Sequence, residues 1–146
     1  MRSSKYNAPQ QKKDKPVVDG YTFDSELEAK YYLERIKPFV GATIEDFKVH
    51  PKYILIPKTK KRSAITYIAD FEIITDGAFA IVDVKGMATE AALIKRKMFE
   101  WKYPELNLFW ACYSKIDGGW IEYDALQRAR AKRRKEKKKG AGRKHG

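Results

Sequence analysis

The run YIADFEIITDGAFAIVDVKG, residues 67–86, constrains the fold of this chain more than any other segment. Asp76-Gly77 stands between two alternating runs rich in β-branched residues, which is a strong signal for a hairpin with a two-residue turn. The sequence therefore predicts two paired strands, over residues 65–75 and 78–84.

This turn fixes which residues face each other across the hairpin. Asp70 is expected directly opposite Asp83, and Lys85, two residues further on, points to the same side. The other side is apolar throughout, which supports the register. Its expected pairs are Ile73 with Ala80, Phe71 with Val82, and Ala69 with Val84.

Two carboxylates in this arrangement need compensation. Directly opposed side chains have Cβ atoms about 4.5–5.5 Å apart, and like charges there are destabilising. Lys85 can neutralise one carboxylate in a purely structural role, whereas a divalent cation neutralises both. Mg²⁺ commonly binds one or two carboxylates together with substrate phosphate oxygens. The geometry favours a metal–phosphate site, and the two interpretations are compatible because a lysine beside such a site can meet a phosphate.

The segments before the hairpin predict a helix and a strand. Ser25 and Glu28 fit a capping box that begins a helix ending near Pro38. Its expected apolar contacts are Leu27, Tyr31, Leu33 and Ile36. Residues 47–57 then predict a strand interrupted by Pro51, and a basic loop leads to the hairpin.

After the hairpin, residues 89–104 predict a second helix. The residues expected on its buried face are Ala91, Ile94, Met98 and Trp101. Residues 106–113 predict a buried strand, and a turn at Gly118-Gly119 leads to a short strand and a helix that continues into the tail. The order helix, three strands, helix, strand predicts a single α/β domain with a mixed central sheet flanked by helices.

A third acid near Asp70 and Asp83 can come from the first helix, where Glu28 and Glu26 are the candidates. A structural role is open for each of them. Glu28 completes the capping box, and Glu26 can pair with Lys30 one turn further on.

The net charge of +12 is concentrated at the two ends of the chain. Residues 1–16 carry five basic residues and one acid, residues 127–146 carry eleven and one, and residues 17–126 are close to neutral. We therefore expect a folded domain between a basic N-terminal arm and a basic C-terminal tail. Basic residues bind phosphates with release of counterions, so nucleic acid is the expected partner and a merely solubilising tail the alternative. A membrane surface is less favoured because the tail lacks large apolar residues.

The cellular setting follows from two further features. A single cysteine, Cys112, excludes an internal disulfide framework and cysteine-rich zinc sites, and its apolar surroundings predict a buried thiol. No apolar run approaches the length of about 20 residues needed to cross a bilayer, and the first residues contain no apolar signal segment. The expectation is a soluble, intracellular protein.

The arrangement of Asp70 before a hairpin and Asp83-Val84-Lys85 after it, with a glutamate on a preceding helix, resembles the PD-(D/E)XK nuclease superfamily. The expected order of helices and strands is also that of the superfamily's core. Five segments resemble, more narrowly, small phage-encoded nucleases of this superfamily that belong to the Holliday-junction-resolvase type. They are YTFDSELEAKYY, VHPKYILIP, YIADFEI, VDVKGMAT and KRKMFEWKYP, and they cover most of residues 21–104.

The resemblance implies a metal site and a role for each matched residue. Asp70 and Asp83 would bind Mg²⁺, for which Mn²⁺ can substitute, and the Val84 carbonyl would be a further ligand. The chain departs from the superfamily name because Ala69 replaces the proline before the first aspartate and because Asp83 is the shorter of the two permitted acids. The superfamily tolerates both departures.

The same resemblance gives Lys85 the task of orienting or activating the attacking water and steadying charge on the phosphate. Glu28 would complete or support the metal site, with Glu26 in reserve. Basic residues elsewhere are candidate contacts to nucleic acid, with a solvated surface as the alternative for the loop and the helix. They are Lys58, Lys60, Lys61 and Arg62 in the basic loop, Lys95 and Lys97 on the second helix, and Arg133 and Arg134 in the tail.

Other conspicuous side chains are expected to be structural. His50 has no second histidine nearby and is interpreted as a structural or surface residue. Four aromatic residues are assigned to the core rather than to base stacking: Tyr31, Tyr32, Trp101 and Trp110.

The function implied is a Mg²⁺-dependent DNA endonuclease that resolves four-way junctions in phage recombination or replication, within the cytoplasm of a bacterial host. Two symmetric incisions require a homodimer. The alternatives are another nuclease of this fold, such as a nicking, flap or restriction-like enzyme, and a non-catalytic nucleic-acid-binding protein. The set of Asp70, Asp83 and Lys85 argues against the last, because a binding protein has no need of opposed buried acids.

Overall fold

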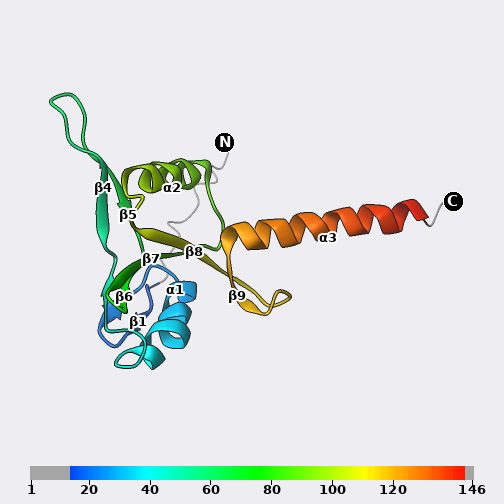
Figure 1. Cartoon of the computed structure of the whole chain (residues 1–146), viewed down its shortest axis with the longest axis horizontal. Coiled ribbons are helices and arrows are strands. Elements are labelled where there is room, and N and C mark those ends of the chain that lie inside the picture. Colours follow the sequence, from blue (N-terminus) through cyan, green and yellow to red (C-terminus); the bar gives the residue numbers. More distant parts are fainter. Residues whose placement is uncertain (1–13, 144–146) are drawn as a thin grey trace, which may run out of the picture.

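A five-stranded sheet and three α-helices build a mixed α/β structure, which the computed structural model describes for residues 14–143 (Figure 1). Most of the expected N-terminal arm, residues 1–13, lies outside the described residues. The helical segments are α1 (Glu26–Tyr31), η1 (Tyr32–Ile36), η2 (Lys37–Phe39), α2 (Glu90–Lys102) and α3 (Tyr123–Arg143). The strands are β1 (Val17–Val18), β2 (Tyr21–Thr22), β3 (Asp46–Val49), β4 (Lys52–Ile56), β5 (Ile65–Ile68), β6 (Phe71–Thr75), β7 (Ala78–Val84), β8 (Asn107–Ser114) and β9 (Gly119–Glu122).

The central sheet has the strand order β3-β6-β7-β8-β9. Strands β7 and β8 are parallel, with α2 as the connection between them, and the other neighbours are antiparallel. Strands β1 and β2 form a small ribbon, and β4 and β5 form another. The order α-β-β-β-α-β expected from the sequence is not the observed one, because five strands, β3 to β7, lie between α1 and α2 where three were expected.

The β6–β7 hairpin has the register predicted from its turn. Thr75 pairs with Ala78, and the ladder runs to Phe71 opposite Val82. Asp76 and Gly77 both have positive φ, 49° and 73°, as a two-residue type I′ turn requires. The predicted apolar face is buried in one core cluster through Phe71, Ile73, Val82 and Val84, with Ala80 packed against it.

The prediction of one strand over residues 65–75 is wrong. The segment divides at Ala69 and Asp70, because β5 pairs with β4 outside the central sheet while β6 remains within it. Ala69 is therefore not opposite Val84 but joins a second core cluster with Ile81. Asp70 follows this break and lies just beyond the end of the β6–β7 ladder.

The strand expected over residues 47–57 breaks at the same level. Val49 pairs with Phe71 and Lys52 pairs with Ile68, so the register continues across the break. At the bend the His50 amide donates to the Asp70 carbonyl at 2.9 Å, and His50 itself is left-handed with φ 55°. The bend therefore places His50 opposite Asp70.

The first helix begins as predicted, since the Ser25 side chain accepts a hydrogen bond from the Glu28 amide at 3.1 Å. It then widens into the π-helical turn η1, which shifts the following side chains around the axis. Tyr32 and Ile36 consequently enter the core, whereas Leu33, predicted as an apolar contact, is exposed.

The predicted buried face of α2 is wrong in three of its four residues, since Met98 packs against the core but Ala91, Ile94 and Trp101 are exposed. Phe99 is fully buried against the β4–β5 ribbon and the sheet, whereas Ile94 is exposed and Trp101 is 84% exposed. The inward face includes Arg96, whose guanidinium lies 4.4 Å from the centre of the Trp110 ring and pairs with Asp124 at 3.2 Å. A partly buried arginine interrupts the apolar pattern, so the periodicity in the sequence indicated the wrong face.

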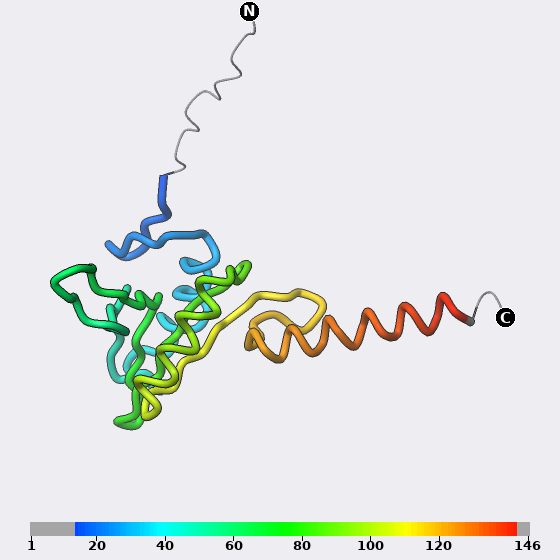
Figure 2. The backbone as a smooth tube through the Cα atoms, turned by 90° about the horizontal axis from the view of Figure 1, so that it is seen from above, coloured from blue at the N-terminus to red at the C-terminus, as the bar shows by residue number. Residues whose placement is uncertain are grey.

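The C-terminal elements follow the sequence prediction. Strand β8 contains the buried Trp110 and Cys112, and β9 leads directly into α3. Leu126 anchors the first turns of α3, and Arg133 pairs with Asp117 in the β8–β9 turn at 2.7 Å. Beyond that pair the helix projects away from the body (Figures 1 and 2). Among residues 14–143, no helix is both long enough and apolar enough to span a membrane.

The two faces of α2 give a stability test. Phe99→Ala is expected to lower the free energy of unfolding by about 3–5 kcal/mol because it leaves a cavity in the core. Trp101→Ala is expected to change it by no more than about 0.5 kcal/mol because the side chain is exposed. Urea unfolding of both variants measures this, and a larger loss in Trp101→Ala would reverse the assignment of the two faces.

Candidate metal centre

The acidic residues predicted for the site meet where β7 ends and the β5–β6 segment bends. Asp83 is the penultimate residue of β7, and Asp70 stands at the bend. Glu28 comes from α1, which packs beside β7. All three carboxylates are buried, with exposed fractions of 5–7%. Their burial in one place makes the site strongly acidic.

A chain of hydrogen bonds holds Asp83 in place. The Trp110 indole N–H donates to the Tyr67 hydroxyl at 2.8 Å, and this hydroxyl donates to Asp83 Oδ2 at 2.5 Å. Lys85 Nζ lies 3.2 Å from the same oxygen. Lys85 thus pairs with Asp83, as its structural interpretation requires, and it also lies at the edge of the acidic site.

Asp70 links the two halves of the site. Its Oδ2 accepts a hydrogen bond from the Val84 amide at 2.6 Å, so the contact observed at Val84 involves the N–H. Burial raises the pKa of Asp70 well above its usual range, and the neighbouring carboxylates of Asp83 and Glu28 raise it further. The protonated form of Asp70 is therefore favoured unless a cation is supplied.

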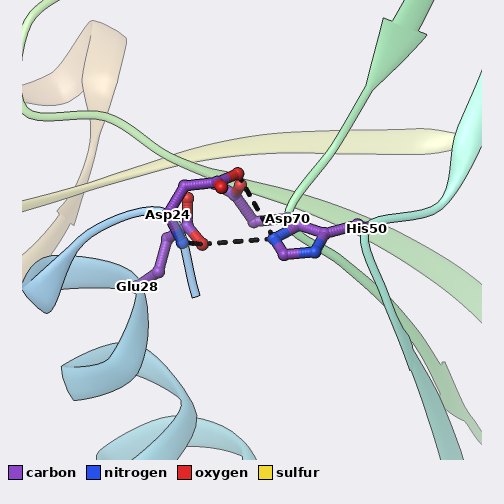
Figure 3. A group of neighbouring side chains, drawn as sticks. All are labelled: Asp24, Glu28, His50 and Asp70. Atoms are coloured by element: carbon purple, nitrogen blue, oxygen red, sulfur yellow. Dashed lines mark hydrogen bonds and ion pairs between the residues drawn. The ribbon is translucent and has the colours of Figure 1, made fainter. Parts of the chain in front are cut away.

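The second half of the site contains His50 and Asp24, which the sequence analysis did not assign to it. His50 Nε2 lies 3.4 Å from Glu28 Oε2 and 3.5 Å from Asp24 Oδ2 (Figure 3). Glu28 Oε2 also accepts a hydrogen bond from the Asp24 amide at 3.0 Å. One ligand atom from each of Asp24, Glu28, His50 and Asp70 lies within 4.8 Å of all the others.

These residues fit a divalent cation. Asp70, Asp83 and Glu28 bring three carboxylates into a buried space that also receives one lysine and one histidine. Carboxylate oxygens suit Mg²⁺ and Mn²⁺, and an imidazole nitrogen favours transition metals over Mg²⁺. The arrangement can therefore hold a cation on either side of Asp70, towards Asp83 or towards Glu28 and His50.

The remaining predicted residues lie away from this centre or at its rim. Glu26 is exposed, and its expected partner Lys30 lies over the Tyr113 ring at 3.4 Å. Arg133 is held by Asp117. Seven basic candidates are exposed: Lys58, Lys60, Lys61 and Arg62 between β4 and β5, Lys95 and Lys97 on α2, and Arg134 on α3. Tyr32 and Trp110 are in the core as predicted, Tyr31 is partly buried, and Trp101 is not in the core.

The fold and this site define an α/β protein with a buried acidic centre. Residues 3–117 match the family described as "Protein of unknown function (DUF1064)". The match covers most of the chain, and the protein belongs to this family. No curated protein matches the chain.

The raised pKa of Asp70 predicts how stability depends on pH without metal. Between the unfolded pKa near 4 and the higher folded pKa, the folded state binds more protons, so stability falls as pH rises. Asp70→Asn removes this penalty and keeps an acceptor for the Val84 amide. In EDTA the variant is expected to melt about 3 °C or more above wild type at pH 8, with the gap closing towards pH 4. A gap that did not change with pH would contradict this account.

Proposed function

We propose that this protein is a metal-dependent endonuclease that hydrolyses DNA phosphodiesters with a site of the PD-(D/E)XK type. One observation carries the proposal: Asp70, Asp83 and Glu28 are buried together, with Lys85 paired to Asp83 at their edge. Buried like charges are costly, and their retention is typical of a functional site. A divalent cation relieves that cost.

The residues divide the work of hydrolysis between them. Asp70 and Asp83 would hold a Mg²⁺ or Mn²⁺ ion, with the Val84 carbonyl as a further ligand and Glu28 as support. The ion, when bound, lowers the pKa of water and polarises the phosphoryl oxygen. Lys85 would face the phosphate, where its ammonium group steadies negative charge and orients the attacking water. The water oxygen forms a new bond to phosphorus and loses a proton, one P–O ester bond breaks, and the leaving oxygen takes up a proton.

His50 and Asp24 extend this ligand set on the other side of Asp70. An imidazole beside carboxylates strengthens binding of Mn²⁺ relative to Mg²⁺. Mn²⁺ is therefore expected to support activity at lower concentrations than Mg²⁺ does.

The substrate we propose is branched DNA, with the four-way junction of phage recombination or replication as the leading case. Exposed basic residues lie on the β4–β5 loop, on α2 and on α3, so several elements can contact phosphates at once. Residues 14–143 contain no separate domain for base recognition, which favours recognition of DNA shape. Two symmetric cuts require two active sites, so the active form would be a homodimer.

The direct test compares a labelled four-way junction with a linear duplex of the same sequence, in Mg²⁺ or in EDTA. Wild type is expected to cut the junction symmetrically in Mg²⁺ only. Asp83→Ala is expected to reduce cleavage below detection while retaining binding, because the carboxylate is lost but the basic surfaces remain. Cutting of both substrates would leave an endonuclease without junction preference. Binding without any cleavage by wild type would refute the enzyme and leave a nucleic-acid-binding protein.

A matched pair of tyrosines tests the support of Asp83. Tyr53 and Tyr67 pair across β4 and β5, and each donates a hydrogen bond to a carboxylate, Glu72 for Tyr53 and Asp83 for Tyr67. Tyr67→Phe is expected to weaken Mn²⁺ binding by about 10- to 100-fold, as losses around metal ligands commonly do. Tyr53→Phe removes a similar hydrogen bond away from the site and is expected to leave the affinity for Mn²⁺ unchanged. Calorimetric titration with Mn²⁺ measures both, and equal losses would contradict the role of Tyr67.

A further inference from the structure

Strands β4 and β5 form an arm, residues 52–68, whose connecting loop stands out from the body of the protein (Figures 1 and 2). The arm's base contains Tyr67, which contacts Asp83, and the next bend contains Asp70. One end of the arm is therefore part of the candidate metal centre, and the other end is in solvent.

The charge of this segment has one sign. Residues 47–69 contain six basic residues and no acid. Four of the six lie in the connection between the strands: Lys58, Lys60, Lys61 and Arg62. All four are exposed, and none forms an ion pair within residues 14–143. Because ion pairs within the described residues do not account for this cluster, it is suited to bind a polyanion.

The arm is held in position on its inner face. Tyr53, Leu55 and Tyr67 pack in the same core cluster as Phe99 of α2. Lys102 Nζ and the Tyr103 hydroxyl both donate to the Ile54 carbonyl at 2.8 Å. The α2 helix thus fixes the direction of the arm.

The tip has a defined shape. The Thr59 amide donates to the Arg62 carbonyl at 2.9 Å, and the Arg62 amide donates to Thr59 Oγ1 at 3.1 Å. These two hydrogen bonds close a turn that contains the basic residues. The positive charges therefore lie together at the outer end of the β4–β5 ribbon.

The outer face of the arm is apolar and exposed. Ile54, Ile56 and Ile68 lie on it beside Lys52. An exposed apolar strip beside cations is typical of a binding surface. A two-stranded ribbon fits the major groove of B-DNA, where aliphatic side chains can contact thymine methyl groups.

We propose that the arm binds duplex DNA on one side of the scissile phosphate, with its basic tip on phosphates about one helical turn away. Lys60 and Asp70 are ten positions apart, and an extended strand covers about 33 Å over that length. One turn of B-DNA is about 34–36 Å long. The inference rests on the proposed function in placing the scissile phosphate at Asp70 and Asp83, and it adds a minimum length of duplex to the substrate.

The test measures binding of hairpin-closed DNA duplexes of about 6, 12 and 24 base pairs by fluorescence anisotropy in EDTA, so that cleavage plays no part. For wild type, affinity is expected to rise about tenfold or more once the duplex exceeds one turn. A variant with Lys58, Lys60, Lys61 and Arg62 all changed to Ala is expected to lose this rise. Its slope of log affinity against log salt on the longest duplex should be smaller in magnitude by about 3.6 if all four residues contact phosphates.

The control changes Lys135, Lys137, Lys138 and Lys139 on α3 to Ala, which removes the same charge from a different element. This variant is expected to bind more weakly but to keep the rise with length. A rise that survives in the arm variant, or disappears only in the control, would overturn the proposal. If affinity rises with duplex length but wild type shows no Mg²⁺-dependent cleavage, DNA binding by the arm is supported and the nuclease activity is refuted. If wild type cleaves DNA but the arm variant binds as wild type does, the nuclease activity is supported and DNA binding by the arm is refuted.

The isoleucine face allows one competing occupant, a second copy of this chain. Sedimentation and DNA binding of a variant carrying Ile54→Ser and Ile68→Ser distinguish duplex DNA from a second copy as the occupant of this face. Conversion of a dimer to a monomer, with DNA affinity unchanged, would overturn the proposal. Unchanged mass with weaker binding to the longest duplex would support it.

Discussion

The hydrogen bond from the Val84 amide to the Asp70 carboxylate links the fold to the site. Strand β7 has β8 on one side, where the Lys85 amide donates to the Ala111 carbonyl. Neighbouring amides along a strand point in opposite directions, so the Val84 amide points to the side from which β5 has departed. A side-chain oxygen takes the place of the missing strand. Because β5 leaves the central sheet, the Val84 amide has no strand carbonyl to donate to. The same bend brings the Asp70 carboxylate, which accepts its hydrogen bond.

The separation of β5 from the central sheet also explains why carboxylates are grouped at the centre. Asp70 is drawn inward to satisfy a backbone group and is thereby placed beside Asp83 and Glu28. Tyr67, the residue two positions before the break, satisfies Asp83 from the other direction with the help of Trp110. Lys85 offsets part of the charge at Asp83, and the His50 ring lies beside Glu28. The centre is thus built from backbone geometry, and a bound cation would complete its charge balance.

The parts of this structure that the sequence predicted correctly depend on local chemistry. An Asp-Gly turn sets a register by itself, and Ser25 caps a helix through residues within one turn of it. The wrong predictions concern residues whose burial or neighbours depend on contacts with residues distant in the sequence. Trp101 is exposed because Arg96 occupies the inward face through contacts with Trp110 and Asp124. His50 enters the site only through the pairing of β3 with β6, and the one local sign was Pro51, since proline inside a strand often marks an irregularity.

The continuous register across the bend also limits how the chain can change in length. His50 lies opposite Asp70 because equal numbers of residues separate each of them from the paired strands on both sides. A single residue inserted between Val49 and Lys52 would separate this pair, and one inserted within β4 or β5 would turn the inner tyrosines outward. Insertions between Pro57 and Ala64 would only lengthen the tip. Natural variation in length should therefore collect at the tip of the arm, where, under the proposed function, it would alter the span of DNA contacted and leave the candidate metal centre at the base unchanged.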